Sequence, residues 1–266
     1  MSIRCVWGVL CGLMIISTIG CSKPENPHSE LKNKSKKLGS DKSKTVPKAS
    51  DKKTAIKSTV VIYQESETGI KPYFTRYIVN QYFMRIDDGK PDTGYVLLDR
   101  KKNIIYSVSV ENESILVIKF APITIKKPPN LVSKLISKNV AENLKLEGVP
   151  ALEHEIRVNG KLCIKNMSVS GVLPNYVAAL KQYKAILAGQ HASNLFKTPV
   201  NMRKNCFMAY NIFEHGLYTA KGLIVRSWND NGKQSILRDY KKDQKAAAGL
   251  FSLPEKYSKF KAGQVP

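Results

Sequence analysis

The stretch GYVLLDRKKNIIYSVSVENESILVIKF, residues 94–120, decides the fold class of this 266-residue chain. It contains three runs rich in β-branched and aromatic residues, separated by short polar segments. Such runs favour β-strands, and short polar breaks between them are typical of tight turns. We therefore expect an antiparallel meander in this part of the chain.

Strand-forming sequence continues on both sides of this stretch. STVVIYQ (58–64) and YFTRYIVNQYFMRID (73–87) precede it, and LEHEIRVNGKLCIKNMSV (152–169) and GLIVRSWNDNGKQSILRDY (222–240) follow it. Each of the two later segments has an Asn-Gly pair between extended runs, which is a strong signal for a β-hairpin. Antiparallel sheet is therefore expected to form the body of the domain.

One segment has helical periodicity. In LPNYVAALKQYKAIL (173–187), apolar residues recur at intervals of four, three and four, at Tyr176, Leu180, Tyr183 and Leu187. Pro174 near the start and Gly189 just beyond this segment fit the start and the stop of a helix. Its apolar stripe must cover one face of the sheet. The sequence predicts a mainly β (α+β) domain over residues 58–262, with irregular structure at 121–134, where Pro128 and Pro129 lie.

The N-terminus has the layout of a secretory signal. Residues 1–21 contain one charge at Arg4, then an apolar run, then a small residue before Cys21. The apolar run of about 14 residues is shorter than the roughly 20 that a membrane-spanning helix needs. We therefore expect export without a permanent membrane span.

The cleavage region also indicates lipidation. TIGC (18–21) resembles the lipobox of bacterial lipoproteins, and the resemblance implies that Cys21 becomes the acylated first residue of the mature chain. The alternative is an ordinary secretory signal with a chance cysteine. Ser22, in place of the aspartate that retains enteric lipoproteins, favours the outer membrane over the inner one, with the domain facing the periplasm.

Residues 22–57 predict a disordered, lysine-rich tether. They contain eleven lysines against four carboxylates and almost no apolar residues, so they cannot bury enough surface to fold. A flexible coil of this length reaches about 30–35 Å. The whole chain has a net charge of +22, which is either a solvated surface or an attraction to anionic lipid, lipopolysaccharide or an acidic envelope partner. Because the chain is expected to be exported, nucleic acid is not an expected partner.

The cysteines predict one disulfide. Cys5 and Cys11 leave with the signal and Cys21 takes the lipid, so Cys163 and Cys206 are the remaining thiols. In an oxidising compartment such a pair forms a disulfide, and the alternative is two free buried thiols. The bond would close a loop of 44 residues that contains the expected helix, and it would contribute about 4 kcal/mol by the chain-entropy estimate.

A sheet of this kind with a helix on one face resembles the half-barrel of LolA-like and RseB-like envelope proteins. The resemblance depends on FMRIDDG (83–89), YVLLDRKKNIIYSV (95–108), a late hairpin and a closing LFSLPEKY strand (250–257). The chain is also similar to uncharacterised Gram-negative envelope proteins that have the helix LPNYVAALKQYKAILAG (173–189) between two cysteines. The resemblance implies a curved sheet with the helix against its concave face.

For LolA-like proteins, the resemblance implies that the concave apolar face holds acyl chains or an extended peptide. The candidates to line such a groove here are apolar residues of the helix and of the facing strands: Val96, Leu98, Tyr176, Leu180, Tyr183 and Leu187. The alternative is that these residues form the core between helix and sheet.

No catalytic motif stands out in the sequence. It lacks a glycine-rich phosphate loop, a GxSxG or HExxH motif and a second cysteine pair with metal spacing. His154 lies between Glu153 and Glu155, but on a strand it would point to the opposite face from both. We therefore expect no enzyme, no metal and no cofactor.

The sequence leaves two hypotheses for the function. The leading hypothesis is a non-catalytic envelope lipoprotein that binds a hydrophobic or amphipathic ligand, such as an acyl chain, lipopolysaccharide or an unfolded polypeptide. The alternative is a tethered scaffold for protein or cell-wall interactions whose cavity is filled. The two differ in whether the concave face is open.

Overall fold

The computed structural model describes residues 55–140 and 144–262, which belong to one compact unit. The expected signal peptide, Cys21 and nearly all of the expected tether lie outside the described residues. The first strand begins at Ala55, three residues before the expected start of the domain.

Most of the described chain forms strands. They are β1 (Ala55–Glu67), β2 (Ile70–Val79), β3 (Phe83–Asp87), β4 (Tyr95–Asp99), β5 (Ile104–Ser109), β6 (Ser114–Lys119), β7 (Ser133–Asn139), β8 (Lys145–Leu146), β9 (Val149–Pro150), β10 (Leu152–Val158), β11 (Lys161–Val169), β12 (Leu223–Asn229), β13 (Gln234–Ala247) and β14 (Ser258–Lys261). The helical elements are α1 (Pro174–Leu195), η1 (Val200–Met202), α2 (Asn205–Met208), η2 (Ala209–Phe213), η3 (Leu217–Thr219) and η4 (Ala248–Phe251).

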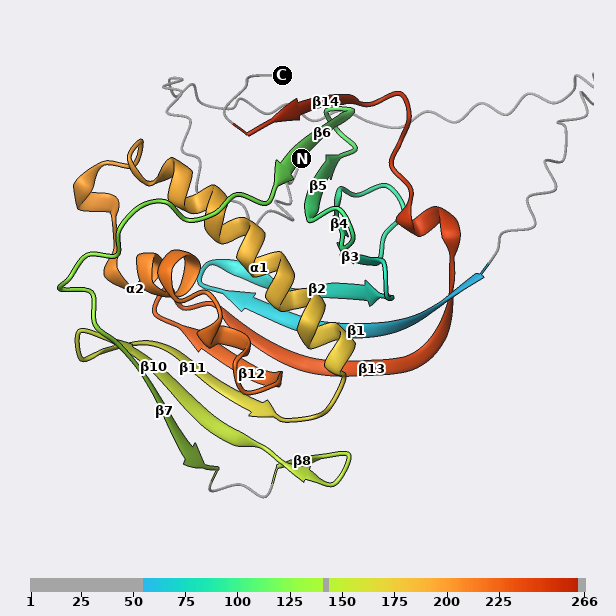
Figure 1. Cartoon of the computed structure of the whole chain (residues 1–266). Helices are drawn as coiled ribbons and strands as arrows, with labels where there is room; N and C mark the ends of the chain where they lie inside the picture. The colour runs from blue at the N-terminus through green and yellow to red at the C-terminus, as the bar shows by residue number, and fades with distance from the viewer. Residues whose placement is uncertain (1–54, 141–143, 263–266) are drawn as a thin grey trace, which may run out of the picture. The chain divides into compact units, whose positions relative to one another are not determined.

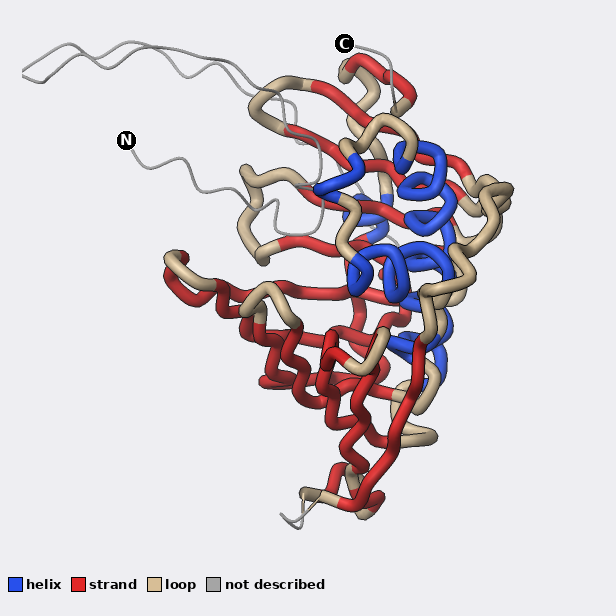
Figure 2. Tube along the Cα trace, turned by 90° about the vertical axis from the view of Figure 1, so that its left-hand side faces the viewer, coloured by secondary structure: helices blue, strands red, loops and turns tan. Residues whose placement is uncertain are grey.

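Twelve of the described strands form one sheet in the order β14-β6-β5-β4-β3-β2-β1-β13-β12-β11-β10-β7, and β8 pairs separately with β9. The sheet is curved and does not close, and α1 lies across its concave face (Figures 1 and 2). α1 contacts β2, β5 and β6 in one arm of the sheet, while Ala192 and Leu195 near its end pack with Ile156 of β10 and Ile164 of β11 in the other arm. The expected α+β half-barrel is confirmed.

The Asn-Gly pairs form hairpin turns as expected. Asn159 and Gly160 both have positive φ, 51° and 81°, which is the conformation of a two-residue type I′ turn between β10 and β11. In the β12–β13 turn, Asn229 Oδ1 accepts hydrogen bonds from the backbone N–H groups of Asn231 and Lys233. These local signals determine the register of two hairpins in one arm of the sheet.

The structure corrects two strand predictions. Residues 73–87 belong to two strands, because Asn80 forms a turn in which its Oδ1 accepts hydrogen bonds from the N–H groups of Tyr82 and Phe83. LFSLPEKY (250–257) contains the end of η4 and an irregular segment, and the last strand, β14, follows it. β14 also pairs parallel to β6, whereas the other pairs in the sheet are antiparallel.

The helix prediction is right at its start and wrong at its end. α1 begins at Pro174, after Leu173 in a left-handed conformation, but it continues through Gly189 to Leu195. At Gly189 the helix approaches the backbone of Ala121, where the chain has just left β6, and a Cβ on Gly189 would lie 2.1 Å from the Ala121 oxygen. Gly189 therefore permits a close contact and does not end the helix.

The convex face has a smaller apolar cluster of its own. Ile78, Leu97 and Phe251 are buried there together, and Phe83 stacks on Phe251 with ring centroids 5.8 Å apart. Arg85 donates to the carbonyl oxygen of Leu250 and lies over the Tyr95 ring. These contacts hold η4 against the back of β3 and β4.

Candidate binding surface

The expected groove residues come from α1 and from β4 of the sheet whose concave face α1 crosses. Leu98, Tyr176, Tyr183 and Leu187 are buried, while Val96 and Leu180 are half-buried. Tyr176 packs on Tyr63 of β1 and Tyr77 of β2, with ring centroids 6.5 and 5.4 Å away. The helix therefore occupies the place on the concave face where an acyl chain would lie.

A further part of the concave face is covered by the segment after α1. Met208, Ala209 and Ile212 are buried with Ile156 and Ile164 of the sheet. The irregular segment after β6 adds Ile123 and Ile125 to the same cluster. α1 and the segments that follow α1 and β6 thus cover much of the concave face.

His154 and its neighbouring glutamates do not form a cluster. Glu155 pairs with Lys138 and Arg157 on one face of β10, while His154 Nδ1 lies 2.9 Å from Ser137 Oγ on the other. Alternation along the strand separates them, as expected. Within residues 55–140 and 144–262, no group of three or more His, Cys, Asp or Glu side chains could hold a metal ion.

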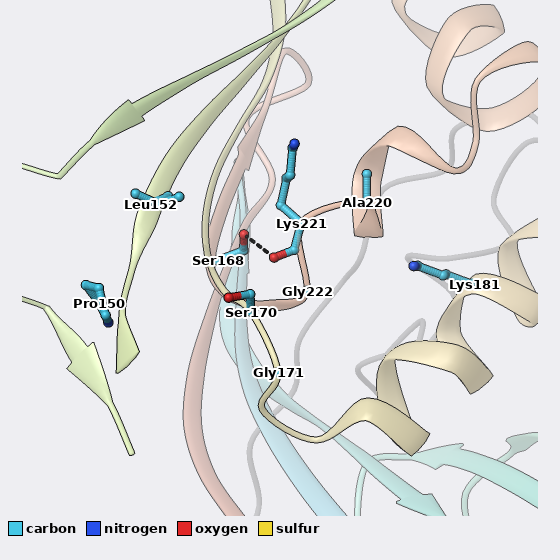
Figure 3. Close-up of a pocket in the computed structure, with 9 residues that line it drawn as sticks. All are labelled: Pro150, Leu152, Ser168, Ser170, Gly171, Lys181, Ala220, Lys221 and Gly222. Atoms are coloured by element: carbon cyan, nitrogen blue, oxygen red, sulfur yellow. Dashed lines mark hydrogen bonds between the residues drawn. The ribbon is translucent and has the colours of Figure 1, made fainter. Parts of the chain in front are cut away.

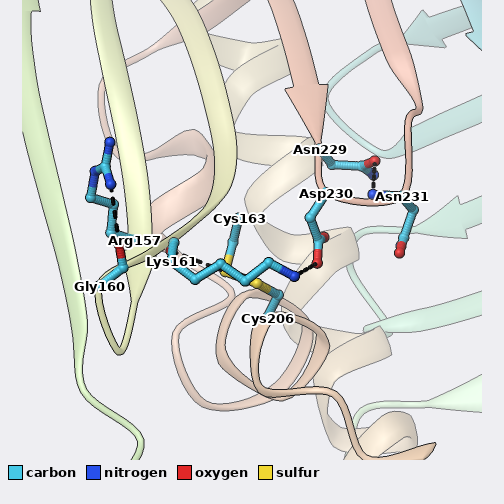
Figure 4. The surroundings of a disulfide bond; sticks show 8 residues. All are labelled: Arg157, Gly160, Lys161, Cys163, Cys206, Asn229, Asp230 and Asn231. Carbon is cyan, nitrogen blue, oxygen red and sulfur yellow. Dashed lines mark hydrogen bonds and ion pairs between the residues drawn. A yellow bond between two sulfur atoms is a disulfide. The ribbon is translucent and has the colours of Figure 1, made fainter.

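The predicted disulfide between Cys163 and Cys206 is confirmed. It joins β11 to the start of α2, and the two Cα atoms are 5.4 Å apart (Figure 4). A hollow of about 400 Å³ lies beside it, with Lys161, Lys204 and Asp230 among its lining residues. Lys161 Nζ is 3.5 Å from an oxygen of Asp230. The bond fastens the segment after α1 to the sheet.

An exposed loop connects α1 to this disulfide, and we call residues 196–204 the disulfide loop. Its apolar side chains Phe196, Val200 and Met202 are 71%, 77% and 46% exposed. Such residues usually pack inside a domain, so three of them exposed within seven positions make this loop a candidate contact surface.

The disulfide loop has an internal brace. Arg203 donates from Nε to the carbonyl oxygen of Thr198 at 2.9 Å and from Nη2 to that of Phe196 at 3.3 Å. The backbone N–H of Met202 donates to Pro199 O. These bonds satisfy backbone oxygens that the loop would otherwise leave to water, and they fix the loop as a compact turn with its apolar side chains outward.

The disulfide loop lies in a part of the chain without negative side chains. Between Glu155 and Glu214 the sequence has no Asp or Glu and eight Lys and Arg residues. Lys197 and Lys204 are exposed within the loop itself. These 58 residues without a carboxylate are the sequence signal that could have identified the region. The net charge of the whole chain does not show where a basic surface lies.

None of the helices in the described part of the chain is both long enough and apolar enough to cross a bilayer.

No protein-family model matches the chain, and no curated protein matches it in sequence. Among solved structures, it is similar to an uncharacterized conserved protein from Thermus thermophilus, with a TM-score of 0.39 and 8% identity over 77% of this chain and 90% of that one. It is also similar to PNGF-II in two crystal forms, with TM-scores of 0.37 and 0.39 and 12% identity. Those matches cover 77% and 78% of this chain but 31% and 32% of PNGF-II. These TM-scores are too low to support an inference about function.

Proposed function

We propose that this protein is a non-catalytic, lipid-anchored protein of the Gram-negative envelope whose domain docks onto an anionic lipid surface through the disulfide loop. The observation that carries the proposal is the combination of three exposed apolar side chains with exposed cations on one braced loop. The acyl chains on Cys21 would supply one attachment and the loop a second.

The chemistry of the loop fits a lipid surface better than a second copy of the chain. Basic residues near an anionic bilayer contribute about 1 kcal/mol each, and apolar side chains gain further free energy when they enter the headgroup region. Two copies meeting through this loop would bring Lys197 and Lys204 of each copy together, with no carboxylate in the segment to pair them.

The position of α1 on the concave face argues against a carrier of acyl chains. A chain held there would have to displace α1, whose buried residues include Tyr176, Tyr183 and Leu187. Exposing three such side chains costs about 1.5–3 kcal/mol each. The proposal therefore departs from the leading hypothesis of a ligand carrier, and it differs from the tethered scaffold for protein or cell-wall interactions in having an anionic lipid surface as the partner.

Co-sedimentation with lipid vesicles tests the proposal. The mature chain is prepared with Cys21→Ser, so that any binding comes from the polypeptide, and is mixed with phosphatidylglycerol–phosphatidylethanolamine or pure phosphatidylcholine vesicles. The triple variant Phe196→Ser, Val200→Ser and Met202→Ser should bind the anionic vesicles at least about tenfold more weakly, since a loss of 1.4 kcal/mol is tenfold.

The matched control is Ile70→Ser, Phe74→Ser and Tyr82→Ser. These side chains are 52%, 54% and 52% exposed on β2 and the β2–β3 turn, and both triple variants keep the basic tether. The control should bind like the parent. Equal binding of the loop variant and the parent would overturn the proposal, as would loop-dependent binding to an envelope protein without binding to vesicles.

A further inference from the structure

A second hollow lies beside the first half of α1, and we call it the serine hollow (Figure 3). Its volume is about 330 Å³, and its lining includes Pro150, Leu152, Ser168, Ser170, Lys181 and Lys221. This volume is at the low end of the range for small-molecule sites. We propose that the serine hollow binds a small polar ligand through an anionic group, a phosphate or a carboxylate.

The shape of the hollow follows from two glycines. Gly171 has φ of 77° and turns the chain from β11 toward α1. Gly222 has φ of 112°, and a Cβ there would lie 2.4 Å from the carbonyl oxygen of Val169. The 220–222 segment therefore runs directly against the end of β11, and one side of the hollow is backbone.

The charge of the hollow is positive. Lys181 of α1 and Lys221 after η3 contribute ammonium groups, and no lining residue is acidic. In the described part of the chain neither lysine has an ion-pair partner. Glu153 of β10, next to the lining residue Leu152, pairs instead with Lys138 of β7 and Lys165 of β11. An anion at this position would meet two cations and the hydroxyl of Ser170, while the hydroxyl of Ser168 donates to the carbonyl oxygen of Lys221 at 3.3 Å.

A buried polar wall continues from the hollow along the sheet. Leu152 pairs with Ser168 across β10 and β11, and the next pair on the same face is His154 with Asn166. His154 and Asn166 are 2% and 3% exposed, yet His154 Nε2 and Asn166 Oδ1 have no hydrogen-bond partner among the described residues. The same holds for Oγ1 of Thr219, which directly precedes the lining residue Ala220.

Unpaired buried polar atoms are rare in folded proteins, because each costs about 1–3 kcal/mol. His154, Asn166 and Thr219 adjoin the lining of the hollow without being part of it, and their unpaired atoms point to a polar occupant that extends inward from it, either water or the hydroxyl groups of a ligand. The pKa of His154 is lowered by burial and by the positive charge of Lys221, so the imidazole is neutral at pH 7 and can accept or donate a hydrogen bond. The polar wall thus suits a ligand that carries hydroxyls beside its anionic group.

Calorimetric titration of the mature chain tests this inference with three probes: glucose 6-phosphate, glucuronate and glucose. The variant Lys181→Gln with Lys221→Gln removes both cations. Its control, Lys101→Gln with Lys119→Gln, makes the same charge change at exposed lysines of the β4–β5 turn and β6, away from the hollow.

We expect saturable binding of glucose 6-phosphate or glucuronate that is weakened at least tenfold in the Lys181/Lys221 variant and unchanged in the control. Preference for glucose 6-phosphate would assign the anion as phosphate, and preference for glucuronate as carboxylate. The inference is overturned if no probe binds, if glucose binds as tightly as the charged probes, or if both lysine variants weaken binding equally. The disulfide loop is not involved in this titration, so its result is independent of vesicle binding.

Discussion

Gly189 of α1 lies against the carbonyl group of Ala121, so that a Cβ at position 189 would be 2.1 Å from the Ala121 oxygen. Gly189→Ala should destabilise the domain by about 1–3 kcal/mol, because the helix or the segment after β6 must move to admit the methyl group. In an open helix the same change would stabilise by about 1 kcal/mol. Urea unfolding at pH 7 measures the difference.

Gly216→Ala is the control for this substitution. Gly216 has φ of −70°, and a Cβ there would meet no atom within 4 Å. The free energy of unfolding of the Gly216→Ala variant should equal that of the parent or exceed it slightly. A Gly189→Ala variant as stable as the control would show that α1 and the Ala121 segment are not in tight contact.

Gly189 also illustrates which features the sequence could predict. The start of α1, both Asn-Gly turns and the meander depend on neighbouring residues, and they are predicted correctly. Gly189 in a helical pattern indicates a stop by the same local logic, but here a segment 68 positions earlier requires the glycine. Contacts between distant segments are not visible in local periodicity.

The candidate binding surface was harder to predict for a related reason. The disulfide pairing followed from counting thiols, but the residues between α1 and β12 gave no periodic signal, since α2 and η1–η3 are each at most five residues long. The exposure of Phe196 and Val200 depends on Arg203, which braces the loop through backbone oxygens. Apolar residues in a sequence predict burial by default, so an outward-facing set appears only in the structure.

The second prediction concerns Asp87, which is buried between two arginines. Its carboxylate accepts hydrogen bonds from Arg76 and Arg85 at 2.6–3.0 Å. Burial would raise the pKa of Asp87, but these hydrogen bonds and charges outweigh it, and the pKa lies below its ordinary value. Asp87→Asn should cost about 3 kcal/mol at pH 7, because Arg85 is left with an uncompensated buried charge.

The pH dependence of Asp87→Asn has a defined sign. The pKa of Asp87 is lower in the folded chain than in the unfolded chain, where it is about 3.9, so the ionised carboxylate stabilises the parent above that pH. This stabilisation is lost as the pH falls through the pKa of the folded state. The gap in unfolding free energy between parent and variant should therefore narrow below about pH 4. Asp92→Asn makes the same charge change at an exposed position of the following loop and should show no gap at pH 7.

The third prediction tests the disulfide. Cys163→Ser with Cys206→Ser should lower the free energy of unfolding by about 2–4 kcal/mol, because the 44-residue loop is no longer closed in the unfolded chain. Reductant should lower the parent by a similar amount and leave the double variant unchanged. If reductant destabilises both proteins equally, the bond does not form in solution.

The fourth prediction concerns Lys184, whose ammonium lies over the Tyr218 ring, 4.1 Å from its centroid. It has no ion-pair partner in the described part of the chain. Burial, and then the charge of Lys233, lowers the pKa of Lys184 to about 8. His191, further along the same helix, has a pKa lowered to about 4 by burial and by the charge of Lys184, so its imidazole is neutral at pH 7 and above.

The sign of the effect follows from proton counting. Between about pH 8 and 10 Lys184 binds more protons in the unfolded chain, where its pKa is near 10.4, than in the folded one, so its own contribution to the stability of the parent should rise with pH. Buried tyrosines such as Tyr63 and Tyr183, whose pKa values are raised by burial, contribute the opposite slope equally in the parent and in the two lysine variants. Lys184→Met should remove this rise and be about 1–2 kcal/mol more stable than the parent at pH 7, after allowance for the partial exposure of the side chain. Lys181→Met, the same substitution on the exposed side of the same helix, should keep the parental slope. Urea unfolding of the three proteins at pH 7, 8 and 9.5 measures the free energy of unfolding and its change with pH. If that change is the same for all three proteins, the Tyr218 ring stabilises the Lys184 ammonium as much as water does, and the prediction is wrong.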